Sequence, residues 1–292
     1  MKPKTVREAY LQASSFLRRR NVSDAGRCAE LLLQHALGVS RSELFLRWEE
    51  PLPSQVQRRW RRLVARKALG EPVQYITGEQ YFYGLPFAVG PEVLIPRPET
   101  ELLVEEAIRR GRELFAARRP VVVDVGTGSG AIAVAMAACC PDWNIIATDI
   151  SAAALAAARR NAARNGVERR IAFLRGDLLF PLIERRIAVD ALVANPPYVR
   201  TADIAGLQRE VTCFEPHLAL DGGPDGLNVY RAIVEQLPRL EKYPRFIGFE
   251  VGCGQAEAVR EMLSACGAWD DLYIVNDLAG IGRHVIGWKK KS

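Results

Sequence analysis

Four consecutive residues, Asn195-Pro196-Pro197-Tyr198, combine groups suited to holding an amino or amide nitrogen. The Asn195 side-chain oxygen and the Pro196 carbonyl are both acceptors, and neither proline has an N–H that competes for them. Two neighbouring acceptors match a planar NH2 group, and Tyr198 offers a ring to stack on its plane. Because proline fixes φ, the backbone here is stiff before any ligand binds. Taken alone, the four residues also fit a proline-rich strand exit with a capping asparagine.

A second set of residues predicts a cofactor that carries a nucleoside. The run Asp124-Val125-Gly126-Thr127-Gly128-Ser129-Gly130 closes one expected strand and opens a helix, and its glycines let the backbone approach a ligand closely. The next expected strand ends at Asp149, where a carboxylate can accept hydrogen bonds from both hydroxyls of a ribose. The glycine spacing also fits the dinucleotide fingerprint, and Asp149 also fits a helix cap. Strand, glycine loop, helix, strand and acid in register favour the cofactor.

Asp177 and Leu178 follow the third expected strand. A carboxylate at this edge suits the amino group of an adenine, and Leu178 suits the face of its ring. Asp177 comes directly after Gly176, so a turn explains it equally well.

The elements that position these residues form an alternating series. From Pro120 onwards strands and helices alternate, which predicts a mostly parallel α/β sheet. The last two strands have too short a connection for a crossover helix, so we expect the final strand to be antiparallel. The residues above then share the carboxyl edge of the sheet, where ligands bind. The expected strands are 121–125, 145–149, 171–175, 188–194, 245–251, 272–276 and 284–288, and the expected helices are about 130–140, 152–164, 227–240 and 254–266.

The N-terminal part has a different character. Residues 5–70 show apolar residues at helical spacing, with helix starts expected at Ser23-Asp24, Ser40 and Pro53-Ser54. Residues 73–98 carry aromatic and β-branched residues between glycines and prolines, which predicts a hairpin linker. A helix should follow from about Glu101 to Ala117. We therefore expect a small helical domain at 1–72, a linker at 73–98 and a catalytic domain at 99–292.

Charge and composition limit the class of protein. Residues 1–75 hold 15 Lys/Arg and 7 Asp/Glu, whereas the rest holds 25 and 27, so the N-terminal part is basic. That surface suits a partner that carries nucleic acid, an acidic protein surface or plain solvent. No apolar run is long enough to span a membrane, and no signal peptide is expected. The six cysteines show no metal or CxxC spacing, which predicts free thiols in the cytoplasm and no metal.

Taken together, these motifs resemble the amino-methyltransferases that use S-adenosylmethionine, and among them the release factor glutamine methyltransferase family (PrmC/HemK). The resemblance covers nearly the whole chain, including the helical N-terminal part, both motifs and residues 214–231. Its most diagnostic stretch is residues 71–101, EPVQYITGEQYFYGLPFAVGPEVLIPRPETE, because generic methyltransferases lack it.

The resemblance implies a Rossmann-like methyltransferase sheet of seven strands and a helical domain that docks the substrate. It implies methyl transfer from S-adenosylmethionine, with S-adenosylhomocysteine as product, to the amide nitrogen (N5) of the glutamine in the Gly-Gly-Gln loop of peptide chain release factors, which modulates translation termination. It also implies a cytoplasmic monomer with no membrane or nucleic-acid substrate. The implied catalytic residues are Asn195, Pro196, Pro197 and Tyr198, and the implied cofactor-binding residues are Gly126, Thr127, Gly128, Ser129, Gly130, Asp149, Asp177, Leu178 and Asn195.

Three other functions fit part of the sequence. A DNA or RNA adenine N6-methyltransferase uses the same acceptor loop on a flipped base, but no large target-recognition segment follows Tyr198. The function of a nicotinamide-dependent oxidoreductase would explain the glycine turn but would give the Asn195 loop no role. A non-enzymatic binding module accounts only for the helical domain.

Overall fold

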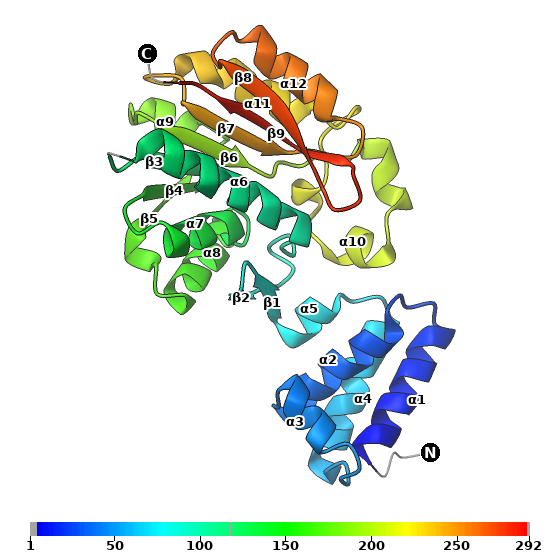
Figure 1. Ribbon diagram of the computed structural model, residues 1–292. Helices are drawn as coiled ribbons and strands as arrows, with labels where there is room; N and C mark the ends of the chain where they lie inside the picture. Colours follow the sequence, from blue (N-terminus) through cyan, green and yellow to red (C-terminus); the bar gives the residue numbers. More distant parts are fainter. Residues whose placement is uncertain (1–4, 117, 291–292) are drawn as a thin grey trace. The chain divides into compact units, whose positions relative to one another are not determined.

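The computed structural model describes residues 5–116 and 118–290, which form two compact units (Figure 1). One unit is the chain up to Glu79 together with Gln208–Phe214, and the other is Gln80–Leu207 with the chain from Glu215 onwards. The predicted boundaries at 72/73 and 98/99, and the docking role of residues 1–72, stay predictions.

The first unit is helical, as the apolar spacing predicted. Its core is formed by aliphatic side chains with Trp60, including Leu17, Leu32 and Leu44. The helix start at Ser40 is confirmed as a capping box with Glu43, whereas the Asp24 side chain makes no capping hydrogen bond and its backbone is left-handed. The helices are α1 (Val6–Arg19), α2 (Ala25–Leu37), α3 (Arg41–Leu46), α4 (Ser54–Ala68) and α5 (Val73–Thr77).

A segment from far along the chain belongs to this helical unit. The fully buried Lys67 forms an ion pair with Glu210 in α10 (Arg209–Phe214) and donates to the Glu71 carbonyl at 3.2 Å. The Arg209 side chain donates to the Leu69 carbonyl at 3.1 Å. A buried ammonium group needs a charged partner, and Glu210 provides one for Lys67. This ion pair accounts for the packing of α10 against the helical unit.

The predicted hairpin linker is confirmed in one half and wrong in the other. Strands β1 (Glu79–Phe82) and β2 (Leu85–Ala88) pair as a two-stranded sheet, whereas residues 73–77 form the helix α5. The helix ends at Gly78, whose φ of 78° only glycine adopts readily. Val73 and Ile76 are buried in the helical core, so packing decides against the strand preference of these residue types.

The second unit contains, among the described residues, a seven-stranded sheet in the order β5-β4-β3-β6-β7-β9-β8. The first five strands are parallel, and β9 is antiparallel to both β7 and β8, which confirms the predicted antiparallel final strand. Strand β6 begins three residues later than expected because the Asp190 carboxylate accepts the Val121 N–H at 2.9 Å. The strands are β3 (Val121–Val125), β4 (Asn144–Asp149), β5 (Ile171–Arg175), β6 (Ala191–Ala194), β7 (Phe246–Glu250), β8 (Asp271–Asn276) and β9 (Gly282–Trp288).

Helices cover both faces of this sheet (Figure 1). On one face pack α6 (Pro98–Phe115), α7 (Ala131–Cys139) and α8 (Ala152–Arg164). On the other, α9 (Phe180–Glu184), α11 (Asn228–Gln236) and α12 (Ala256–Ala265) share a core with the sheet. Helix α6 begins at Pro98, earlier than expected, because proline suits the first helical turn. Its predicted end at Ala117 lies outside the described residues.

Candidate active site

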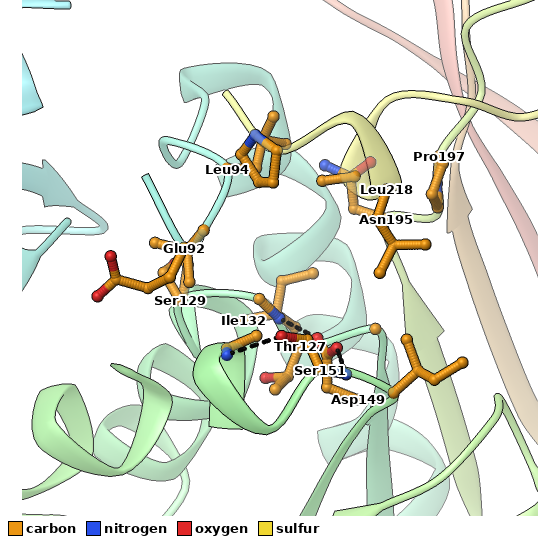
Figure 2. A pocket seen from close by; sticks show the side chains of 18 of the residues that line it. Glu92, Leu94, Thr127, Ser129, Ile132, Asp149, Ser151, Asn195, Pro197 and Leu218 are labelled. Atoms are coloured by element: carbon orange, nitrogen blue, oxygen red, sulfur yellow. Dashed lines mark hydrogen bonds between the residues drawn. The ribbon is translucent and has the colours of Figure 1, made fainter. Parts of the chain in front are cut away.

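A cavity of about 270 Å³ lies at the carboxyl edge of the parallel strands in the second unit. Its lining combines residues at the ends of four strands (β3, β4, β5 and β6) with residues of α6, α7, α8 and α11 and of two segments, 92–97 and 216–221. Figure 2 shows side chains of both chemical groups predicted from the sequence, Asp149 and Asn195, around this one space. The topology therefore joins motifs that stand 46 residues apart in the chain.

The glycine loop after β3 forms one wall of the cavity. Gly126, Thr127, Gly128 and Ser129 line it, and Gly126 and Gly128 have φ of 71° and 56°, which the loop's tight path requires. Gly130 does not line the cavity. It has a φ of 83° and stands at the N-cap of α7, directly before Ala131, and a Cβ there would lie 3.0 Å from the Ala158 Cβ.

Below this loop, Asp124 anchors the turn. Its Oδ2 accepts the Thr127 hydroxyl at 2.5 Å and the Ala133 N–H at 3.1 Å. Burial raises the pKa of Asp124 to about 7, although both hydrogen bonds oppose the shift. A buried acid thus ties the loop to the first turn of α7.

Asp149 lies at the end of β4 and lines the cavity beside the glycine loop. Its carboxylate accepts the Gly128 N–H at 2.9 Å and the Ser151 N–H at 2.8 Å, so its orientation is set by backbone. Burial raises its pKa, against the effect of these hydrogen bonds. Each carboxylate oxygen retains a further lone pair, so Asp149 can still accept hydrogen bonds from a ligand.

Asp177 and Leu178 also line the cavity, at the edge next to β5. The Asp177 side chain is exposed and Leu178 is half-buried. Leu178 has a φ of 48°, an unusual conformation for leucine, and its carbonyl accepts the Thr148 hydroxyl at 3.3 Å. The backbone at Leu178, fixed by this hydrogen bond, thus places both side chains at the carboxyl edge of the sheet, as predicted.

Asn195 stands directly after β6 and lines the cavity, together with Pro197. Its Nδ2 donates to the Thr100 hydroxyl at 3.1 Å, and that hydroxyl donates to Glu250 Oε2 at 2.6 Å. Among the described residues no donor reaches Asn195 Oδ1 or the Pro196 carbonyl. Neither predicted acceptor therefore receives a hydrogen bond from the described residues, and of the two only Asn195 lines the cavity.

Pro196 and Tyr198 are not among the lining residues. Pro196 is buried, whereas Tyr198 is half-buried and packs against the sheet core. The Tyr198 hydroxyl lies 3.5 Å from Glu250 Oε1, and its carbonyl accepts a hydrogen bond from Gln255 at 3.0 Å. Tyr198 thus holds the loop from behind, and its stacking on a substrate stays a prediction.

Several residues that line the cavity lie outside the motifs recognised in the sequence. Thr100 is in the first turn of α6, and the segment with Leu94 and Arg97 faces the segment with Leu218. The buried Glu215 joins the two segments, because it accepts from Arg97 at 2.5 Å and from the Ile95 N–H at 3.4 Å. No residue pattern marks these positions as chemical, although both segments carried the family resemblance.

Comparison with known proteins identifies the family. The PrmC N-terminal domain family matches residues 8–78, and the methyltransferase small domain family matches residues 100–213. A release factor glutamine methyltransferase of Geobacter sulfurreducens is 42% identical over 97% of this chain and 96% of its own length. That of Bacillus subtilis is 39% identical over 97% of both chains. This chain belongs to the release factor glutamine methyltransferase family.

Solved structures with the same fold are more distant in sequence. The Mettl16 catalytic domain in complex with a MAT2A 3′UTR hairpin superposes with a TM-score of 0.56 at 18% identity, covering 79% of this chain and 82% of its own. The N-terminal domain of human METTL16 in complex with SAH has a TM-score of 0.50 at 20% identity, covering 80% and 84%. At this identity they support the methyltransferase fold, which the sheet order also displays.

Two features are absent from the part of the chain that the structure describes. No group of three or more His, Cys, Asp or Glu side chains there is placed to hold a metal ion. No helix in residues 5–116 or 118–290 has the length and apolar character to cross a membrane.

Proposed function

We propose that this protein transfers a methyl group from S-adenosylmethionine to the side-chain amide nitrogen of the glutamine in the Gly-Gly-Gln loop of peptide chain release factors. The observation that carries the proposal is the single cavity that has Asp149 and the glycine loop at one end and Asn195 at the other. Family membership over nearly the full length of the chain supports this substrate over a nucleic-acid base, a nicotinamide substrate or a purely binding role.

The cavity suits the proposed cofactor. Asp149 offers free lone pairs for ribose hydroxyls, the Gly126–Gly128 turn admits a ligand close to the backbone, and Asp177 with Leu178 suits an adenine. When bound, S-adenosylmethionine supplies a methyl group on a positively charged sulfur, which makes that methyl electrophilic. The protein then has to hold the accepting nitrogen in line with it, and such positioning supplies roughly 7–11 kcal/mol of barrier reduction.

Asn195 and Pro196 perform that positioning. An amide nitrogen delocalises its lone pair into its carbonyl, which makes it a poor nucleophile. Asn195 Oδ1 and the Pro196 carbonyl accept its two N–H bonds, and both hydrogen bonds strengthen as positive charge develops on the nitrogen. The N–H proton becomes acidic only as the new N–C bond forms, so the site needs no strong base. Pro197 provides the wall beside this amide.

The direct test is incubation of the protein with labelled S-adenosylmethionine and either a bacterial release factor or duplex DNA. We expect label on the release factor only, and mass spectrometry should place one added methyl on the glutamine of the Gly-Gly-Gln loop. Label on DNA instead, or no label on the factor, would contradict the proposal.

We also propose that the helical unit docks the release factor and that the reaction takes place in the cytoplasm with the protein as a monomer. The exposed side chains of Arg58, Arg61 and Arg62 lie at helical spacing on α4, so they form one basic face that suits an acidic protein surface. Replacing all three by glutamate should raise KM for the intact factor and leave KM for S-adenosylmethionine unchanged. Light scattering tests the monomer.

A control of equal charge change is available in the second unit. The exposed Arg118, Arg119 and Arg169 lie outside the cavity lining, so their triple replacement by glutamate should leave both KM values unchanged. An equal rise in KM for the factor in both triple variants would reflect net charge rather than docking by α4.

A further inference from the structure

The proposed chemistry depends on which end of the Asn195 carboxamide faces the cavity. The terminal torsion of asparagine has two roughly equivalent settings, one that presents the oxygen and one that presents the NH2 group. Only the oxygen can accept an N–H from a substrate amide. Something in the protein must therefore select one setting.

The selecting contacts lie behind Asn195, on the side of the sheet that α6 covers. Residue 194 of β6 is the register partner of residue 249 of β7, so Asn195 and Glu250 stand next to each other at the ends of neighbouring parallel strands. Thr100, in the first turn of α6, lies between their side chains. Thr100 is 4% exposed and Glu250 2% exposed, so water does not compete for these groups.

Proton counting fixes the direction of the chain of hydrogen bonds. An ionised carboxylate only accepts, so the single Thr100 hydroxyl proton goes to Glu250 Oε2, at 2.6 Å. The Thr100 oxygen then has only lone pairs left for Asn195, and it must receive an N–H, at 3.1 Å from Nδ2. The opposite setting of the amide would place two oxygens against each other with no proton between them, in a buried site.

We propose that Thr100 and Glu250 are positioning residues that lock the Asn195 carboxamide with Oδ1 towards the cavity. This inference rests on the proposed function, because the locked oxygen is the acceptor for the substrate amide. Thr100 and Glu250 act through Asn195, and neither is assigned to touch the reacting atoms.

The lock depends on the charge state of Glu250. Burial raises the pKa of Glu250 to about 7, and the Thr100 hydrogen bond and the nearby Asn195 NH2 group oppose that rise. A proton on Oε2 would turn the carboxyl into a donor towards Thr100. Thr100 would then donate to Asn195 and select the oxygen, which would leave the NH2 group facing the cavity. The turnover rate should therefore fall as pH decreases through about 7.

Several other titratable groups lie near Glu250. The exposed Glu99 raises the pKa of Glu250, and Arg283 on β9 lowers it. His284, opposite Glu250 on β9, has a pKa lowered to about 4 by burial and is neutral near pH 7. Burial raises the pKa of both neighbouring tyrosines, Tyr198 and Tyr230, so they stay protonated.

The experiment measures initial rates with an intact bacterial release factor and labelled S-adenosylmethionine for the wild type, Thr100→Val, Thr100→Ser and Glu250→Gln. Thr100→Val removes the hydroxyl at nearly constant volume and should lower kcat roughly 10–100-fold, the size of the loss when the hydrogen-bond partner that orients a metal ligand is removed. Thr100→Ser keeps the hydroxyl and should restore most of the rate. Affinity for S-adenosylhomocysteine, by calorimetry, should not change in any of them.

The pH profile separates orientation from packing. The wild-type kcat should decline below about pH 7, and Glu250→Gln should show a lower rate without that decline. As a control, Thr77→Val removes a hydroxyl that bonds only to carbonyls near α5, at 3.0 Å from that of Val73, and should leave turnover unchanged.

Equal rates for Thr100→Val and the wild type, or equal losses for Thr100→Val and Thr100→Ser, would overturn the inference. So would an unchanged acidic decline in Glu250→Gln, which also decides the matter if Thr100→Val fails to fold. A wild type that leaves the glutamine unmethylated would instead refute the proposed function, so the two failures are distinguishable.

Discussion

Replacing Asn195 by alanine removes one acceptor from the proposed amide-holding pair and leaves the cofactor end of the cavity intact. The carboxamide oxygen would accept one N–H of a nitrogen that becomes positively charged, and a charge-assisted hydrogen bond contributes about 1.5–3 kcal/mol. With some loss of alignment added, the barrier should rise by about 3–4 kcal/mol, or roughly 10²–10³-fold in kcat. Thr100 keeps its hydrogen bond to Glu250, so the fold should tolerate the change.

The assay compares single-turnover methylation of a release factor by Asn195→Ala and the wild type, with S-adenosylhomocysteine affinity measured by calorimetry in parallel. Asn144→Ala is the matched control, because Asn144 is exposed at the opposite end of β4. We expect a large fall in rate for Asn195→Ala only, with affinity unchanged in both. A rate for Asn195→Ala close to that of the wild type would refute the acceptor mechanism, and a comparable loss of affinity would move Asn195 to the cofactor site.

Three further outcomes test other parts of the site. Asp149→Asn should raise the dissociation constant for S-adenosylhomocysteine about 10–100-fold, because the amide replaces one carboxylate oxygen by an NH2 donor next to a backbone N–H. A dissociation constant unchanged in calorimetry would count against the ribose contact. Gly130→Ala should lower the melting temperature more than Gly166→Ala. Both glycines have positive φ, but a Cβ added at Gly130 would also lie 3.0 Å from the Ala158 Cβ, whereas one added at Gly166 would meet no atom within 4 Å. Equal losses in the two variants would show that the contact with Ala158 does not matter. Burial raises the pKa of Asp124 to about 7, so the folded state binds more protons than the unfolded state between about pH 4 and 7. This residue therefore makes the free energy of unfolding fall as pH rises through that window. Asp124→Asn should flatten the fall of the melting temperature with pH, and an identical slope in the variant would contradict the assignment.

The alternation of apolar runs and helical spacing was enough to predict the sheet. Strands β3 and β5 have the predicted bounds, because each is a short apolar or β-branched run with a clear break on both sides. The predicted secondary structure is wrong where burial in the core or a side-chain hydrogen bond overrides the local sequence preference. Residues 73–77 form a helix because the helical core needs Val73 and Ile76, and Asp190 shortens β6 by taking a backbone N–H. Local sequence carries neither contact.

The site was predictable to the extent that it lies in contiguous motifs. The glycine loop, Asp149 and Asn195 can each be recognised from their residue types at the end of an expected strand, and the parallel order of the strands brings them together. Thr100 and Glu250 could not be found this way. They stand 95 residues before and 55 residues after Asn195, and their roles depend on strand register and on where α6 begins. Their contact with Asn195 exists only in the fold.

The most direct measurement is tandem mass spectrometry of a bacterial release factor after incubation with this protein and S-adenosylmethionine. We expect a single added methyl on the side-chain nitrogen of the glutamine in the Gly-Gly-Gln loop, and formation of that product roughly 10²–10³-fold more slowly with Asn195→Ala. A methyl found on another residue, or the same product formed at an equal rate by Asn195→Ala, would contradict it.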